Sequence, residues 1–341
     1  MNVTMKKKNL LIYAAAAMSA FIILTAVFLT QKKTGSAAYS RALMGTVVEI
    51  TLMDGEKTSF EQAANAAFGE IERLENIFSS YKTESNVSEI SRSAGGPPVK
   101  AAPELIEALS KAVIVSRLSG GAFDPTVGAL AKVWGYSGEK GRLPDEKEIK
   151  SILPLVDWQA IIIDKEASLA GLKNKGMVLN LGGIAKGYIV EKAIDTLKAN
   201  GVSRAIVKAG GDMVVFQKED AGKRFTIGIQ HPRKPGQLLG ECYPINGAVA
   251  TSGDYERHFE RNNVRYHHIL DPRTGWPANL SRSATIITSD ATLADALSTA
   301  VFVLGPEKGM ALAESLPGVQ AVIVNADGKV FTSKNFRGKI Y

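Results

Sequence analysis

Hydrophobic residues recur every three or four positions between residues 59 and 81. This spacing places them on one face and predicts an amphipathic helix. The pattern predicts further helices at 103–118, 184–198, 291–303 and 306–314, and a short helix leading towards Trp134. Helices are therefore expected along the whole chain.

Shorter alternating or continuously apolar runs predict strands between these helices. The first, at 43–52, begins with the turn Met44-Gly45-Thr46. Strands and helices alternate irregularly, and tight-turn signals lie among them, so the pattern favours an α+β fold with mixed sheets over a regular βαβ series. The other expected strands are 156–164, 177–181, 205–207, 213–216, 225–229, 247–251, 267–270 and 284–288, with two short strands near the end of the chain.

The N-terminal region has a different character. Residues 9–30 form a nearly uninterrupted apolar run of 22 residues, preceded by three lysines at 6–8. Such a run is long enough to span a bilayer, and the lysines favour a cytoplasmic N-terminus. We expect an uncleaved anchor, although the small residues at 36–38 would also suit cleavage of a signal peptide.

This interpretation divides the chain into three parts. Residues 1–33 are the expected transmembrane signal anchor, 34–42 a polar tether, and 43–341 a folded domain. The protein would be a single-pass protein of the cell membrane, with its folded domain outside the cytoplasm.

Charge and cysteine content narrow the possible partners. The formal net charge is +7, but five lysines lie in residues 1–33, and the remainder carries 36 basic against 34 acidic residues. This balance gives no sign of a nucleic-acid-binding surface. Cys242 is the only cysteine. It excludes an intramolecular disulfide and is expected to be a small buried hydrophobic residue.

Asp295 and Thr299 are the first candidates for chemistry. They stand at i and i+4 of a predicted helix, so they share one face and offer a carboxylate and a hydroxyl oxygen, which suit Mg²⁺. An Asp near a helix start can instead be a cap, and a buried Thr can bond to the preceding turn. The flanks of Asp295 are small and apolar, and an ionised carboxylate there needs a compensating cation or donor.

The segment Asn180-Leu181-Gly182-Gly183-Ile184-Ala185-Lys186-Gly187 opens the helix predicted at 184–198. Its glycine spacing is not that of a dinucleotide-binding fold. A structural turn would explain the glycines, whose backbone lets a ligand approach and can turn the Gly183 carbonyl outward, but it would not explain Lys186. A lysine in the first turn of a helix is unfavourable unless something negative lies nearby, and a bound phosphate would serve.

Three further loops contain polar residues. His267 and His268 end a predicted strand and point in opposite directions, so only one can face a site. A lone His is usually structural, but the following Asp271 and Arg273 leave a site role open. The segment 210–212 is interpreted as a structural tight turn, and 251–255 as a loop that offers hydroxyls.

Together these segments resemble the FAD:protein FMN transferase (ApbE) family. The resemblance extends from Met44 to the end of the chain, with eight motifs in the family's order. They are Met44-Gly45-Thr46, 79–90, 121–127, 181–187, 209–212, 250–255, 268–275 and 294–300.

The resemblance implies an α+β, ApbE-like (T-fold-related) domain of mixed sheets covered by helices. Members bind FAD as substrate together with Mg²⁺ outside the cytoplasm. They transfer FMN to a threonine or serine hydroxyl of an acceptor flavoprotein and release AMP. The acceptor would carry a Ser/Thr-Gly-Ala-Thr-type motif and is expected to be a membrane subunit of an electron-transfer chain.

The family's site residues carry over by position. Mg²⁺ would be held by the Gly183 carbonyl, Asp295 and Thr299, and His268 would lie near the reacting group. Such a reaction also needs a proton acceptor for the attacking hydroxyl. His268 is the first candidate, and Asp295 is the second because a metal ligand is a poor base. FAD would contact Met44, Tyr81, Ala122, Phe123, Asp124, Asn180, Lys186 and Ile269.

The chain departs from the family pattern at three positions. Asn180 stands where Asp is usual, Lys208 where Asn is common, and Ser91 where Asn is usual. Asn180 can still hydrogen-bond a flavin or adenine edge but adds no charge. These changes bear on the FAD contacts more than on the reaction.

Two other functions remain open on the sequence. In a Mg²⁺-dependent FAD pyrophosphatase, water would replace the acceptor hydroxyl and yield FMN and AMP. A non-catalytic surface flavin-binding protein is the third hypothesis, but binding alone would not require the metal residues Asp295 and Thr299.

Overall fold

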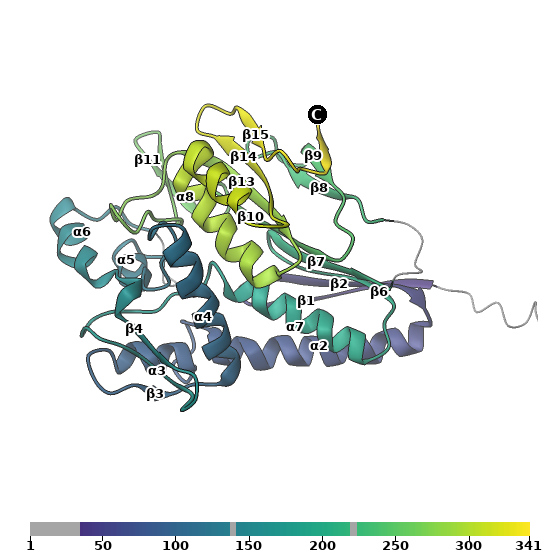
Figure 1. Ribbon diagram of the computed structural model, residues 1–341, viewed down its shortest axis with the longest axis horizontal. Helices are drawn as coiled ribbons and strands as arrows, with labels where there is room; N and C mark the ends of the chain where they lie inside the picture. The colour runs from purple at the N-terminus through teal and green to yellow at the C-terminus, as the bar shows by residue number, and fades with distance from the viewer. Residues whose placement is uncertain (1–34, 137–140, 219–223) are drawn as a thin grey trace, which may run out of the picture.

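The computed structural model describes residues 35–136, 141–218 and 224–341. An eight-stranded sheet runs through the molecule in the order β1-β2-β6-β7-β10-β13-β14-β15 (Figure 1). Every pairing in it is antiparallel. Its strands are β1 (Gly35–Leu43), β2 (Thr46–Gly55), β6 (Arg204–Ala209), β7 (Asp212–Gln217), β10 (Gly247–Gly253), β13 (Ser281–Thr288), β14 (Gln320–Asn325) and β15 (Val330–Thr332).

Long helices cover one face of this sheet, and their apolar sides form the main core. Helices α7 (Ala185–Ala199) and α8 (Ala291–Ser315) pack on the sheet, and α2 (Lys57–Phe78) lies against α7 (Figure 1). The predicted periodicity of α2 is confirmed, since its apolar face is buried. The other helices are α3 (Asn86–Arg92), α4 (Pro103–Leu118), α5 (Gly128–Val133), α6 (Glu146–Ile152) and the 3₁₀ turns η1 (Leu153–Leu155) and η2 (Trp158–Ala160).

The opposite face of the large sheet has a second, smaller core. Val215, Val249 and Ile287 from this face pack against a three-stranded sheet of β8 (Ile227–Gln230), β9 (Leu238–Cys242) and β16 (Gly338–Ile340). Cys242 belongs to this core and is fully buried, and burial raises the pKa of its thiol to about 12. The expectation of a small buried residue at this position is confirmed.

Two small sheets complete the fold. One is built from β3 (Val99–Lys100), β5 (Leu169–Leu172) and β4 (Ile161–Asp164), and the other is the hairpin β11 (His258–Arg261) and β12 (Val264–His267). Aromatic side chains from the hairpin stack around buried Trp134, whose indole N–H donates to the Gly275 carbonyl at 2.8 Å. These contacts hold the hairpin and the turn at Gly275 against Trp134.

The α+β class is confirmed, and several finer expectations are corrected. All pairings between the described strands are antiparallel, so the sheets are not mixed. The expected tether 34–42 lies almost entirely in strand β1. The expected strand 177–181 is irregular apart from a single bridge between Val127 and Val178.

Other differences concern the ends of elements. Regular strand begins at Ile161 rather than at 156, and β12 ends at His267. The two helices expected at 291–303 and 306–314 are confirmed, because α8 breaks between them at Gly305, whose φ of 74° and ψ of −173° are not helical, directly before Pro306.

The predicted anchor, residues 1–33, lies outside the described residues. Within the described ranges, no helix combines the length and the apolar character needed to cross a bilayer.

Candidate active site

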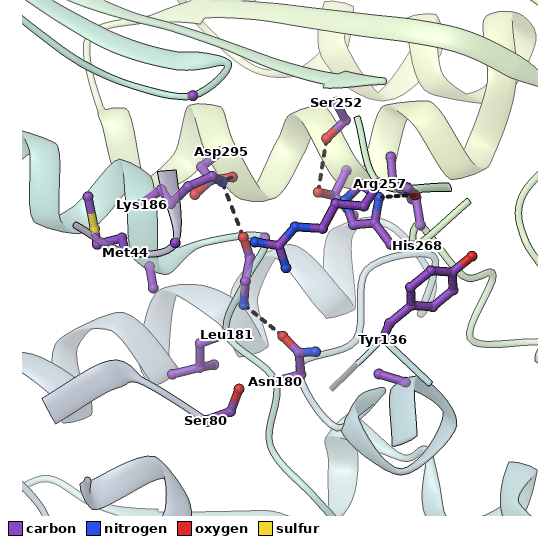
Figure 2. Close-up of a pocket in the computed structure, with 18 of the residues that line it drawn as sticks. Met44, Ser80, Tyr136, Asn180, Leu181, Lys186, Ser252, Arg257, His268 and Asp295 are labelled. Carbon is purple, nitrogen blue, oxygen red and sulfur yellow. Dashed lines mark hydrogen bonds and ion pairs between the residues drawn. The ribbon is translucent and has the colours of Figure 1, made fainter. Parts of the chain in front are cut away.

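All the sequence-predicted site residues line a single cavity of about 580 Å³. It lies where the β1–β2 turn, the start of α7, the first turns of α8 and the end of β10 meet (Figure 2). These elements are distant in sequence and are brought together by the sheet. The predicted residues in its wall are Met44, Tyr81, Ala122, Phe123, Asp124, Asn180, Gly183, Lys186, His268, Ile269, Asp295 and Thr299.

Asp295 ties the two central helices together. The start of α7 has no side-chain cap of its own, and Asp295 Oδ2 on α8 accepts a hydrogen bond from the Gly187 N–H at 2.9 Å. A carboxylate at a helix N-terminus satisfies an otherwise unpaired donor and the helix dipole. Gly187 is required for this approach, because a Cβ at that position would stand 2.2 Å from the Ala291 carbonyl oxygen.

Lys186 lies between two carboxylates. Its Nζ is 2.7 Å from Asp212 Oδ2 and 3.5 Å from Asp295 Oδ1. Burial alone would lower the pKa of Lys186, but the two carboxylates raise it above its usual value. The expectation that something negative must accompany this lysine is confirmed, although these partners belong to the protein itself.

Asp295 is the group in this arrangement whose ionised form is unfavourable. Its side chain is only 3% exposed. Burial, reinforced by the neighbouring Asp212, raises the pKa of Asp295 to about 7, against the opposing effect of Lys186. Two carboxylates and one ammonium leave one negative charge in the site when all three are ionised, so a cation would be favoured there.

The donor set around Thr299 fits a hard divalent cation. A Cβ on Gly183 would stand 2.9 Å from Thr299 Oγ1, so only glycine lets the backbone approach this hydroxyl. Among the described residues no three His, Cys, Asp or Glu side chains converge as a metal cluster. A carboxylate, a hydroxyl and a backbone carbonyl are oxygen ligands that Mg²⁺ accepts while keeping several waters.

The two histidines separate into structural and site positions. His267 is buried, with Nε2 2.7 Å from the Ala278 carbonyl oxygen and Nδ1 accepting from the Ile269 N–H. His268 lines the cavity, and its Nδ1 lies 3.2 Å from the Arg257 carbonyl oxygen. Because a carbonyl can only accept, Nδ1 carries the proton in the neutral ring and Nε2 keeps its lone pair.

Burial and the neighbouring His267 lower the pKa of His268 to about 3. The ring is therefore neutral at physiological pH, and its Nε2 is unprotonated.

Three of the expected FAD-contacting residues also shape the wall. Met44 has a positive φ of 53° and forms a two-residue hairpin turn with Gly45 (φ 68°), a conformation that favours Asn or Gly. Asn180 Oδ1 accepts from the Gly182 N–H at 2.9 Å, a bond that Asp would also make. The buried Asp124 carboxylate binds the Thr126 and Trp158 N–H groups, so it holds its own loop.

Sequence reasoning missed three polar residues of the wall. Asp212 was interpreted as part of a structural turn, but its carboxylate pairs with Lys186. Ser252 hydrogen-bonds Thr299 at 3.1 Å. Arg257 extends into the pocket (Figure 2), and it donates to the Tyr81 hydroxyl at 3.3 Å. Asp212 and Ser252 belong to two of the motifs described above, whereas Arg257 lies just after the second, and only the tertiary structure shows their partners.

The other two departures from the family pattern, Lys208 and Ser91, lie outside the cavity wall. Lys208 pairs with Glu49 across β2 and β6 at 3.0 Å. The Ser91 hydroxyl accepts from the Leu179 N–H. Asp271 and Arg273 bind each other within their turn, so the structure gives them no role in the cavity.

Comparisons with known proteins identify the family of this chain. Residues 44–323 match the sequence profile of the ApbE family. The chain is 34% identical over 313 residues to the FAD:protein FMN transferase of Treponema pallidum, covering 86% of each chain. It is 33% identical over 298 residues to a protein of the same name from Klebsiella pneumoniae, covering 87% of this chain and 91% of that one.

Solved structures give the same result. The crystal structure of the ApbE protein of Thermotoga maritima superposes with a TM-score of 0.82 at 34% identity, covering 88% of this chain and 97% of that one. The flavinyl transferase ApbE of Pseudomonas stutzeri superposes with a TM-score of 0.76 at 29% identity, covering 89% and 96%. The resemblance drawn from the motifs is confirmed, and the chain belongs to the ApbE family.

Proposed function

We propose that this protein transfers the FMN part of FAD to a serine or threonine hydroxyl of an acceptor flavoprotein and releases AMP. The observation that carries the proposal is the cavity itself. It combines a lysine and two carboxylates at a helix N-terminus with a neutral histidine. Membership of a family whose named relatives are FAD:protein FMN transferases supports the same reaction.

The reaction is a single displacement at phosphorus. The acceptor oxygen forms a bond to the FMN phosphorus of FAD, the bond from that phosphorus to the bridging oxygen breaks, and AMP leaves with that oxygen. Such a reaction depends on alignment of the two reactants and on neutralising the phosphate charge. Lys186, in the first turn of α7, supplies a fixed positive charge in the cavity.

We propose that Gly183, Asp295 and Thr299 hold Mg²⁺ in this cavity. When bound, Mg²⁺ would neutralise charge on the pyrophosphate oxygens of FAD. The donor chemistry supports this ligand set, because Gly183 and Thr299 adjoin and Asp295 is a buried carboxylate with an unfavourable charge.

His268 is the proposed proton acceptor. Its Nε2 lone pair is available because Nδ1 donates to the Arg257 carbonyl, and it would take the proton of the attacking hydroxyl. Asp295 is less suitable, since its oxygens already bind the Gly187 N–H and face Lys186.

The location and acceptor are also proposals. The apolar run 9–30 and the lysines before it support a single membrane anchor with the catalytic domain outside the cytoplasm. An anchored enzyme would meet a membrane-bound acceptor with a Ser/Thr-Gly-Ala-Thr-type segment at raised effective concentration.

The test mixes the full chain with FAD, Mg²⁺ and such an acceptor, and follows flavin fluorescence on the acceptor band of a denaturing gel. We expect a band that requires Mg²⁺ and is lost in Asp295→Ala. A matched control is Asp290→Asn on the same helix, because Asp290 caps α8 and pairs with Lys111 outside the cavity.

Three other outcomes would contradict the proposal. AMP and free FMN without a labelled band, at the same rate when the acceptor is omitted, would identify a pyrophosphatase. Bound FAD with neither product would identify a flavin-binding protein. A labelled band of equal intensity in Asp295→Ala would refute the metal site.

A further inference from the structure

We propose that Ser252 is a positioning residue that turns the Thr299 hydroxyl into an oxygen ligand for the divalent cation. This inference rests on the proposed Mg²⁺ site. Ser252 stands near the end of β10 and lines the cavity (Figure 2). Its hydroxyl contacts two hydroxyls of α8. Ser252 Oγ is 2.9 Å from Ser298 Oγ and 3.1 Å from Thr299 Oγ1.

The donor and acceptor in each hydrogen bond among these three hydroxyls are fixed by Ser298, which stands at one end of the row. Ser298 Oγ lies 2.8 Å from the Asp295 backbone carbonyl oxygen. A carbonyl can only accept, so the single Ser298 proton is committed to it. Ser298 Oγ must then accept from Ser252, whose own single proton is committed in turn.

The same reasoning fixes the proton of Thr299. Because Ser252 has already given its proton to Ser298, the contact between Ser252 and Thr299 requires Thr299 to donate. The Thr299 proton is thereby held on the β10 side of the hydroxyl. The oxygen lone pairs are left for the cavity side, where the Gly183 backbone adjoins the same oxygen.

The direction matters because a hydroxyl binds a cation only through its oxygen. A freely rotating Thr299 proton would point at the cation part of the time, and ordering it would cost affinity. Groups that orient a metal ligand in this way typically affect metal affinity by roughly 10–100-fold. Ser252 therefore contributes to cation binding without needing to touch the cation.

The experiment measures Mn²⁺ binding to the full chain by the EPR signal of free Mn²⁺, with and without FAD. We expect Ser252→Ala to weaken Mn²⁺ binding by about tenfold, whereas Ser252→Thr, which keeps the hydroxyl, restores it. Ser333→Ala is the control, since Ser333 is a buried serine whose hydroxyl accepts the Ala321 N–H but lies outside the cavity wall.

Ser252→Cys protects the test against misfolding, because a thiol fills the space of the hydroxyl but hydrogen-bonds weakly. It should lose Mn²⁺ affinity as Ser252→Ala does. Affinity within about twofold of wild type in both variants, while Thr299→Ala loses roughly tenfold or more, would overturn the role of Ser252 alone. A wild-type chain that binds no Mn²⁺ in either condition would overturn the metal site and this inference together.

Discussion

Asp295 performs three tasks with one carboxylate. It caps α7 through the Gly187 N–H, it faces Lys186, and it is the proposed metal ligand. Burial beside Asp212 makes its ionised form costly in the absence of a cation. The buried charge of Asp295 therefore lowers the stability of the fold, while the proposed metal site requires that charge.

The unfavourable burial of this charge predicts that replacing Asp295 changes the stability of the protein. The folded-state pKa of about 7 lies above the usual value of about 3.9. Between these values the folded state holds a proton that the unfolded state lacks, so stability from this group falls as pH rises towards 7. We expect Asp295→Asn to raise the Tm at pH 8 by about 3 °C and to abolish stabilisation by Mg²⁺.

Differential scanning fluorimetry with and without Mg²⁺, at several pH values, checks this prediction. In the wild type the Mg²⁺-induced rise should shrink below about pH 7, since the proton and the cation compete for Asp295. Asp290→Asn should keep the Mg²⁺ effect. An equal Mg²⁺ effect in Asp295→Asn and wild type would contradict the assignment.

His268 gives a prediction about rate and pH. Replacing it with Asn removes the proposed proton acceptor, and kcat should fall by about 10²–10⁴-fold with little change in KM for FAD. Its lowered pKa of about 3 means that protonation of His268 should not reduce kcat between about pH 5 and 8.

Steady-state kinetics of AMP release across this pH range test the assignment. His258→Asn is the control, because His258 is exposed on β11 and lies outside the cavity wall. A His268→Asn enzyme with wild-type kcat would remove His268 from the mechanism.

At the scale of elements, the crossing of α7 and α8 positions the site. The close approach depends on Gly187, where a Cβ would stand 2.2 Å from the Ala291 carbonyl oxygen and 2.8 Å from Asp295 Cβ. The same contact places the Asp295 carboxylate at the N-terminus of α7. Packing and site geometry are therefore set by one small residue.

Gly187→Ala should separate the helices and disturb Asp295. We expect a loss of about 1–3 kcal/mol in the free energy of unfolding, measured by urea denaturation, together with weaker Mg²⁺ binding. Gly69→Ala is the matched control, since Gly69 lies in α2 with open space around its Cβ direction and should be neutral or stabilising by up to about 1 kcal/mol. Equal stability of the two variants would show that the helices tolerate a wider crossing.

Local pattern predicts elements well where one face is buried. The α2 periodicity and the start of α7 were recognisable because their apolar positions repeat. Strand β1 was missed because it is rich in Gly, Ser and Ala and is mostly half-buried or exposed at the sheet edge. The run 177–181 is apolar enough for a strand, but backbone partners from loops, such as Pro125 for the Asn180 N–H, replace a ladder there.

At the scale of the whole molecule, the antiparallel sheet assembles the cavity wall. The pairing of Val249 with Met213 places the first half of β10 beside the start of β7, so the end of β10 continues past that start towards the cavity. Asp212 and Ser252 therefore arrive beside Lys186 and Thr299 from distant parts of the chain. No local pattern contains this information, which is why the roles of Asp212, Ser252 and Arg257 required the structure.

The central claim is that this cavity joins FMN to an acceptor hydroxyl in one displacement. The most direct measurement is the intact mass of the acceptor after incubation with the full chain, FAD and Mg²⁺, with AMP quantified in the same sample. The account predicts one AMP released for each FMN attached, and neither product when Asp295 is replaced by Ala. AMP released without any mass gain on the acceptor, at a rate independent of its presence, would contradict it.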